Sequence, residues 1–131
     1  MKEVAGKHDK VKDADRFSIV CPDLTRCWVC GSTHQVAKHE IFGGANREKS
    51  KYYGLILPLC LTHHNGTSKG IHFNKQLNEK AQRLGQRAWE EKYRDENVCT
   101  AEEARKAFID IFYKNYIMDD EEEPKQRNYV F

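Results

Sequence analysis

The chain has 131 residues, of which 39% are hydrophobic and 32% are charged, and its formal net charge is +2. This length fits one domain with an appended helical part, and the modest apolar content allows only a small core. No apolar run approaches the roughly 20 residues that a transmembrane helix needs, so we expect no membrane partner. The N-terminal segment MKEVAGKHDKVKDADR is polar and charged and lacks the apolar region of a secretory signal, which predicts a cytoplasmic protein.

The charge is distributed unevenly along the chain. Residues 119–123 form one acidic run, and without it 22 basic residues stand against 15 acidic ones, a balance of +7. A basic body with an acidic tail is common in proteins that meet nucleic acid. Charge alone does not decide the matter, because an acidic tail that only aids solubility gives the same pattern.

The first half of the chain predicts short strands separated by turns. Phe17–Val20 has the apolar character of a short strand, and Gln35–Phe42 has strand character until a glycine pair ends it. Ala45–Gly54 is polar and basic and is predicted to be a loop. Leu55–Leu59 is a second apolar strand, and Pro58 indicates that it is an edge strand or ends there.

The second half is helical by periodicity. A helix should begin after Cys60 and be interrupted or reoriented by two glycines, and a longer apolar face follows at helical spacing through Leu77, Ala81, Leu84, Ala88 and Tyr93. A last helix should begin at Thr100, where Glu103 completes a capping box. Its apolar face runs through Ala104, Ala107, Phe108, Ile111, Phe112 and Tyr116. This spacing favours core packing over a platform on which bases stack.

Two half-sites have the spacing of a zinc clamp. They are Cys27-x-x-Cys30 and Cys60-x-x-His63. Zinc prefers four sulfur or nitrogen ligands in a tetrahedron, and in a reducing compartment Cys-x-x-Cys holds metal more often than it forms a disulfide. The intervening segment, 31–59, is long enough for a β-hairpin, so we expect a structural Zn²⁺ that joins the start of the hairpin to the start of the helix. Cys21 lies near enough to stay open as a substitute ligand.

Two further histidines are expected to converge beside this clamp. His39 lies near the end of the first strand, and His64 lies in the first turn of the helix that packs across the hairpin. One imidazole could bind a divalent metal while the other takes a proton from water. Phosphodiester hydrolysis needs these parts: a positioned water, a base and a cation on the scissile phosphate.

At these residues the sequence resembles the HNH endonucleases of the ββα-metal superfamily. The segments KHEIFGGANR, LILPLCLTHHNG and GIHFN are similar to small HNH proteins encoded by bacteriophages, over roughly residues 25–75. The resemblance implies an α+β fold: a zinc-stapled ββα-metal unit with C-terminal helices packed on it. It also implies an endonuclease that cuts DNA with a catalytic Mg²⁺, Mn²⁺ or another divalent metal, located in the host cytoplasm if the protein is phage-encoded.

The expected organisation has four parts. They are a charged N-terminal arm (1–20), the zinc-bound ββα-metal core (21–75), the C-terminal helices (76–118) and an acidic tail (119–131).

The resemblance assigns roles residue by residue. Cys27, Cys30, Cys60 and His63 match the structural zinc ligands of the family. His39 matches the first motif histidine, and His64 the residue after the last zinc ligand, with His72 as a further ligand of the catalytic metal.

Two positions depart from the usual pattern of the family. His39 is followed by Glu40, where many members have two adjacent metal or base residues, so either of the two could be the base; the imidazole is preferred for its pKa. The middle Asn of the motif is not in its usual place, and Asn46 and Asn65 are the substitutes.

Arg47, Lys49 and Lys51 are expected to contact DNA phosphates, a largely sequence-independent contribution. A phage packaging or recombination protein is a possible further partner, and the oligomeric state is not determined by the sequence. The alternative is a zinc-stabilised DNA- or protein-binding module with an HNH-like scaffold that does not cut.

Overall fold

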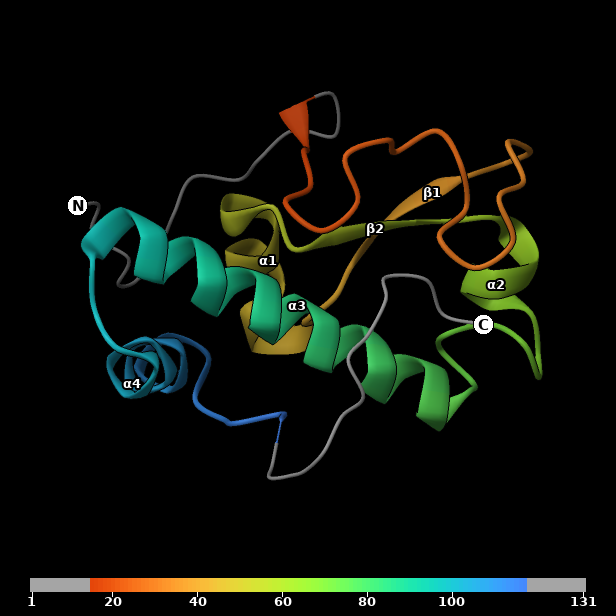
Figure 1. Ribbon diagram of the computed structural model, residues 1–131. Helices are drawn as coiled ribbons and strands as arrows, with labels where there is room; N and C mark the ends of the chain where they lie inside the picture. The colour runs from red at the N-terminus through yellow and green to blue at the C-terminus, as the bar shows by residue number, and fades with distance from the viewer. Residues whose placement is uncertain (1–14, 118–131) are drawn as a thin grey trace.

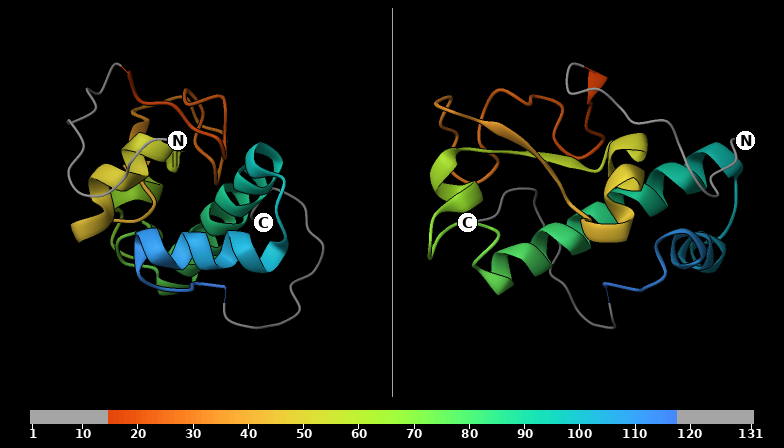
Figure 2. Two further views of the ribbon diagram at one scale, coloured as in Figure 1. Left: turned by 90° about the vertical axis from the view of Figure 1, so that its left-hand side faces the viewer. Right: turned by 180° about the vertical axis from the view of Figure 1, so that it is seen from behind.

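A computed structural model describes residues 15–117, so the start of the N-terminal arm (1–14) and the acidic tail (119–131) lie outside the described part. The protein is mixed α+β, with one two-stranded antiparallel sheet. In chain order the elements are β1 (Ala37–Glu40), the 3-10 helix η2 (Gly44–Asn46), α1 (Arg47–Tyr53), β2 (Ile56–Leu59), α2 (Leu61–Asn65), α3 (Lys75–Asn97) and α4 (Ala101–Phe112). The long helix α3 runs along the hairpin, and α4 packs against α3 (Figures 1 and 2).

The hairpin is formed by β1 and β2, with His39 opposite Leu57 and Lys38 opposite Pro58. Pro58 lacks an N–H, which a two-stranded sheet tolerates because both strands are edges. The first strand is shorter than the predicted Gln35–Phe42, since Gln35 takes a left-handed conformation with φ of 49°. The hairpin and the edge position of β2 are therefore confirmed, with tighter bounds.

The segment Ala45–Gly54 is not the predicted loop, because it folds into η2 and α1. Its helix is held by tertiary contacts that a short polar sequence does not reveal. The Ser50 hydroxyl is fully buried, donates to the Phe42 carbonyl at 2.7 Å and accepts from the Phe42 N–H at 2.9 Å. Gly54 ends α1 in the left-handed region at φ 75°, a conformation that glycine adopts without strain.

The predicted strand over Phe17–Val20 is also wrong, since the chain bends there instead of pairing as a strand. The Ser18 hydroxyl accepts from the N–H groups of Val20 and Cys21 at 3.0 and 2.8 Å, which curls the backbone around it. The same hydroxyl donates to the Ile56 carbonyl at 2.7 Å. This turn fastens the segment to β2, so that residues 16–20 belong to the packed body and not to the arm.

Both C-terminal helices contribute to the core, and the apolar face predicted for α4 is confirmed. The buried face of α3 differs from the predicted one: Leu77 and Ala81 lie on it, but Leu84 and Ala88 are only half-buried, and Gly85, Gln86 and Trp89 are buried instead.

Thr100 accepts from the Glu103 N–H while the Glu103 carboxylate accepts from the Thr100 N–H, which confirms the capping box. The aromatic rings of Phe108 and Phe112 stack with centroids 4.5 Å apart and meet Phe42 at 5.7 and 5.2 Å. This aromatic cluster joins α4 to the end of the hairpin, and the buried side of α3 completes it through Trp89.

Over residues 15–117, no helix has both the length and the apolar character needed to cross a bilayer.

Replacing Ser50 with Ala is expected to lower the free energy of unfolding by about 1–3 kcal/mol, because it leaves the Phe42 N–H buried without a partner. Urea denaturation followed by circular dichroism measures this difference. Ser68→Ala is the matched control, because Ser68 is exposed and its replacement should leave the midpoint unchanged. Equal midpoints for both variants would show that the Ser50 contact does not stabilise α1.

Candidate metal centres

The first centre joins a turn before β1 to the start of α2. Cys27 and Cys30 lie on this turn, which the Gly31 N–H closes by donating to the Cys27 carbonyl at 2.8 Å. Cys60 is the N-cap of α2, and His63 lies one turn further. The Cys-x-x-Cys and Cys-x-x-His spacings therefore bring all four side chains to one point from two short segments.

The distances in this first centre fit a tetrahedral metal. The Cys30 and Cys60 sulfurs lie 3.8 Å apart, and His63 Nδ1 lies 3.4 Å from Cys60 Sγ and 3.8 Å from Cys27 Sγ. Zinc–sulfur bonds of about 2.3 Å in a tetrahedron give sulfur–sulfur distances of roughly 3.8 Å. All four ligand atoms lie within 4.8 Å of one another, so this cluster, the clamp, could hold a metal such as zinc.

The three cysteines of the clamp form no disulfides. Burial raises the pKa of Cys27, but hydrogen bonds from backbone N–H groups, including that of Val29, lower it by more. The lowered pKa of Cys27 favours its thiolate, which is the form that binds metal. Cys21 does not belong to the cluster, since its sulfur contacts the Asp23 carbonyl at 3.8 Å.

The second centre consists of His39, His64 and His72, here called the histidine triad. His39 comes from β1, His64 from α2 and His72 from the turn that leads into α3. The Nε2 atoms of His64 and His72 lie 3.2 Å apart, and the His39 ring centroid lies 5.2 and 5.1 Å from theirs. The three ligand atoms lie within 4.8 Å of one another, so this group too could hold a metal ion.

Two adjacent residues of α2, His63 and His64, belong to different centres. Successive side chains of a helix point about 100° apart, so His63 can face the clamp while His64 faces the triad. The predicted convergence of His39 and His64 is present, and His72 joins them. The Ile71 N–H holds the turn that carries His72 by donating to the His63 carbonyl at 2.8 Å.

His39 is the buried member of the triad, with an exposed fraction of 7%. Its Nε2 atom is buried without a hydrogen-bond partner, which is costly for a polar atom unless a ligand or ion completes it. Burial, followed by the nearby charges of His64 and His72, lowers the pKa of His39 to about 3. The pKa is thus not near neutral, as the sequence suggested for a base, and the imidazole is uncharged at pH 7.

The pKa of His64 is also lowered, which favours the neutral form of its imidazole. Burial and then His72 lower its pKa, while Glu40 acts in the opposite direction. A neutral imidazole nitrogen is the form that can coordinate a metal or accept a proton from water.

Glu40 is held by a partner that the sequence did not reveal. Its carboxylate lies 3.0 Å from the Arg16 guanidinium, which also donates to the Lys38 carbonyl at 3.0 Å. Successive residues of a strand point to opposite faces, and Glu40 is in neither metal-ligand group. Arg16 is distant from Glu40 in sequence, so no local pattern indicated the pair.

The three predicted phosphate contacts lie on α1 and not on a loop. Lys51 is buried, with its ammonium 3.0 Å from Glu48, and the Lys49 ammonium donates to the Ile111 carbonyl at 2.7 Å. Both lysines therefore have intramolecular partners, and the Lys49 contact ties α1 to α4. Arg47 is exposed at the start of the helix.

The two candidates for the middle Asn lie in different surroundings. The Asn46 amide donates to the Phe112 carbonyl at 3.2 Å, so its side chain fastens η2 to the end of α4. Asn65 is exposed at the last position of α2. Asn46 thus has a structural role, whereas Asn65 follows His64 directly.

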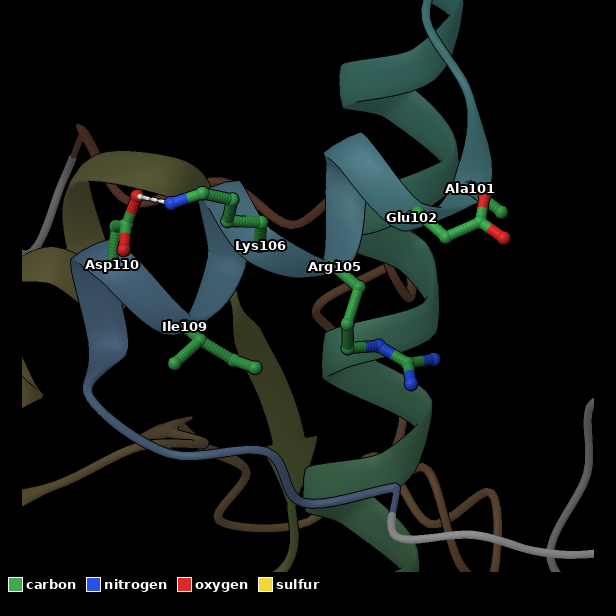
Figure 3. Close-up of a pocket in the computed structure, with 6 residues that line it drawn as sticks. All are labelled: Ala101, Glu102, Arg105, Lys106, Ile109 and Asp110. Carbon is green, nitrogen blue, oxygen red and sulfur yellow. Dashed lines mark ion pairs between the residues drawn. The ribbon is translucent and has the colours of Figure 1, made fainter.

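A surface hollow along α4 is lined mainly by charged side chains (Figure 3). It is lined by Ala101, Glu102, Arg105, Lys106, Ile109 and Asp110. Lys106 and Asp110 pair at 3.6 Å, and Arg105 pairs with Glu90 of α3 at 2.6 Å. These charges are paired within and between the helices, and none of the lining residues belongs to the two groups that could hold a metal among the described residues.

A scan against protein-family models found no match, and neither did searches of curated proteins and of solved structures.

Proposed function

We propose that the protein is a metal-dependent endonuclease of the HNH type that hydrolyses DNA phosphodiester bonds. The observation that carries the proposal is the pair of adjacent but separate metal-ligand groups, one rich in cysteine and one made only of histidines. A clamp of three cysteines and one histidine has the closed ligand set of structural zinc. The histidine triad offers a second set of neutral ligands, with a buried and unsatisfied nitrogen at His39.

In this proposal the clamp would hold Zn²⁺, and two residues of the triad would hold the catalytic ion. His64 and His72 bind that ion, and His39 takes a proton from the attacking water through its Nε2 atom. A divalent cation such as Mg²⁺ or Mn²⁺ held there would neutralise charge at the scissile phosphate and the leaving oxygen. An anionic phosphate near His39 raises the proton affinity of the imidazole, which offsets part of the lowered pKa.

Glu40 and Arg16 have a supporting role in this scheme. Their ion pair and the contact of Arg16 with the Lys38 carbonyl fix β1 on both sides of His39. Glu40 thereby positions the strand, which leaves His39 as the group that meets the water.

A nicking assay on supercoiled plasmid tests the proposal. Zinc-loaded protein should convert the plasmid to the open-circular form with at least one of Mg²⁺, Mn²⁺, Co²⁺ or Ni²⁺, each added singly, and chelation by EDTA should stop the reaction. Absence of nicking with every cation would reject the endonuclease. If such a protein still binds DNA in a salt-dependent way, the alternative of a zinc-stabilised DNA-binding module is the better description.

A further inference from the structure

Backbone hydrogen bonds and one buried side chain stabilise the turn that carries His72. The Gly70 N–H donates to the Gly66 carbonyl at 3.0 Å, and the Phe73 N–H donates to the Gly70 carbonyl at 2.9 Å. Ile71 is buried at 3% exposure, which anchors the turn in the core. The backbone of this turn is thus held in place beside the triad.

Phe73 is an exposed aromatic residue next to a metal ligand. It directly follows His72, and 61% of it is exposed. A single exposed apolar side chain needs no explanation by itself. Here, however, it lies on a fixed turn whose preceding residue has its Nε2 atom 3.2 Å from that of His64.

Lysines flank this aromatic residue on both sides. Lys69 precedes the turn and is exposed. Lys75 follows the turn with 84% of its side chain exposed, and its ammonium lies 3.2 Å from the Glu79 carboxylate on the same helix. Proteins bind unstacked nucleic acid bases and the adjoining phosphates with exposed aromatic rings and cationic side chains, and both kinds of side chain occur in this short segment.

The charges along α3 are unevenly distributed, and the excess of basic residues lies in the half of the helix that begins next to Phe73. Residues 75–87 contain four basic residues and one acidic residue, whereas residues 88–97 contain two basic and four acidic ones. The basic half is the half that begins next to Phe73. A polyanion would therefore be attracted to the end of α3 that lies at the triad.

We infer that Phe73 stacks on a nucleobase next to the phosphate that the triad engages, with Lys69 and Lys75 on the neighbouring phosphates. The face of a base is open only where stacking is interrupted. The preferred substrate is therefore DNA with an unstacked nucleotide at the cut, such as a bulge or a gap, in preference to a continuous duplex. This inference rests on the proposed function for the cleavage step.

Binding to two oligonucleotides of the same sequence tests the inference. One is a continuous duplex and the other carries a single bulged 2-aminopurine, and both are titrated with zinc-loaded protein without added Mg²⁺ or Mn²⁺. The wild type should bind the bulged DNA about tenfold more tightly and quench the 2-aminopurine fluorescence. Phe73→Ala should weaken that binding by about 5- to 150-fold, the range for one stacked base, and abolish the quenching.

Two variants make the comparison specific. Phe73→Trp should keep the affinity and the quenching, because it keeps an aromatic face. Val98→Ala removes another exposed apolar side chain, 89% exposed at the end of α3, and should behave as the wild type. Circular dichroism and zinc content should be the same for all variants.

The outcomes separate this inference from the proposed nuclease. Wild-type affinity and quenching in Phe73→Ala would overturn the stacking role, even if plasmid is nicked. Loss of quenching in Phe73→Ala, with retention in Phe73→Trp, would support the stacking role even if no cation gave nicking, in which case only the nuclease would fail.

Discussion

Replacing His39 with Ala is expected to lower DNA cleavage by about 10²–10⁴-fold, the usual contribution of a general base. The fold should persist, because His39 lies in a short strand whose hydrogen bonds are made by the backbone. The clamp should keep its zinc, since His39 is not among the clamp ligands. The measurement is the initial rate of plasmid nicking by protein of equal zinc content.

His34→Ala is the matched control for this variant. His34 is an exposed histidine outside both metal-ligand groups, so its replacement should leave the rate unchanged. A His39→Ala protein that cuts as fast as the wild type would remove His39 from the mechanism. Loss of the second metal ion together with cleavage in His39→Ala would assign His39 as a ligand and not as the base.

Replacing Cys60 with Ser is expected to unfold the protein at ordinary temperatures. Structural zinc contributes roughly 10–16 kcal/mol in small zinc domains, which equals or exceeds the whole stability of a typical domain at about 5–15 kcal/mol. Cys60 also begins α2, the helix that carries both His63 and His64, so its loss affects both centres. Far-UV circular dichroism, thermal melting and zinc content measure the effect.

Cys99→Ser is the matched control, because Cys99 is a free thiol outside the clamp. This variant should keep one equivalent of zinc and the wild-type melting temperature. If Cys60→Ser also retained both, the clamp would not be the staple of this fold.

The features that follow from local spacing could be predicted from the sequence. Cys-x-x-Cys and Cys-x-x-His set the geometry of each half of the clamp within one turn, and the box of Thr100 and Glu103 sets the start of α4. The hairpin length then brings His39 opposite α2, so that the convergence of the histidines could also be anticipated.

The features that depend on distant contacts could not be predicted in this way. Helix α1 contains few apolar residues, and it is held by the bond of Ser50 to Phe42 and of Lys49 to Ile111. The charge of Lys51 suggested a phosphate contact, but its pairing with Glu48 and its burial depend on the fold.

The lowered pKa of His39 could not be predicted from the sequence either. A near-neutral pKa is the ordinary value for histidine, and only the packing around His39 and the approach of two other imidazoles lower it. The pairing of Glu40 with Arg16 could not be predicted either, because it depends on the turn at Ser18, which brings Arg16 beside β1.

The most direct test of two separate centres is to count bound metal and measure nicking on the same protein samples. Zinc-loaded wild type is expected to bind one further equivalent of Mn²⁺ in equilibrium dialysis and to nick plasmid. The double variant His64→Ala/His72→Ala should keep its zinc and its circular dichroism spectrum, bind no second ion and cut roughly 100-fold more slowly or worse, by the loss of the metal ligands. A folded double variant that nicks plasmid at the wild-type rate would contradict the assignment of the histidine triad as the catalytic centre.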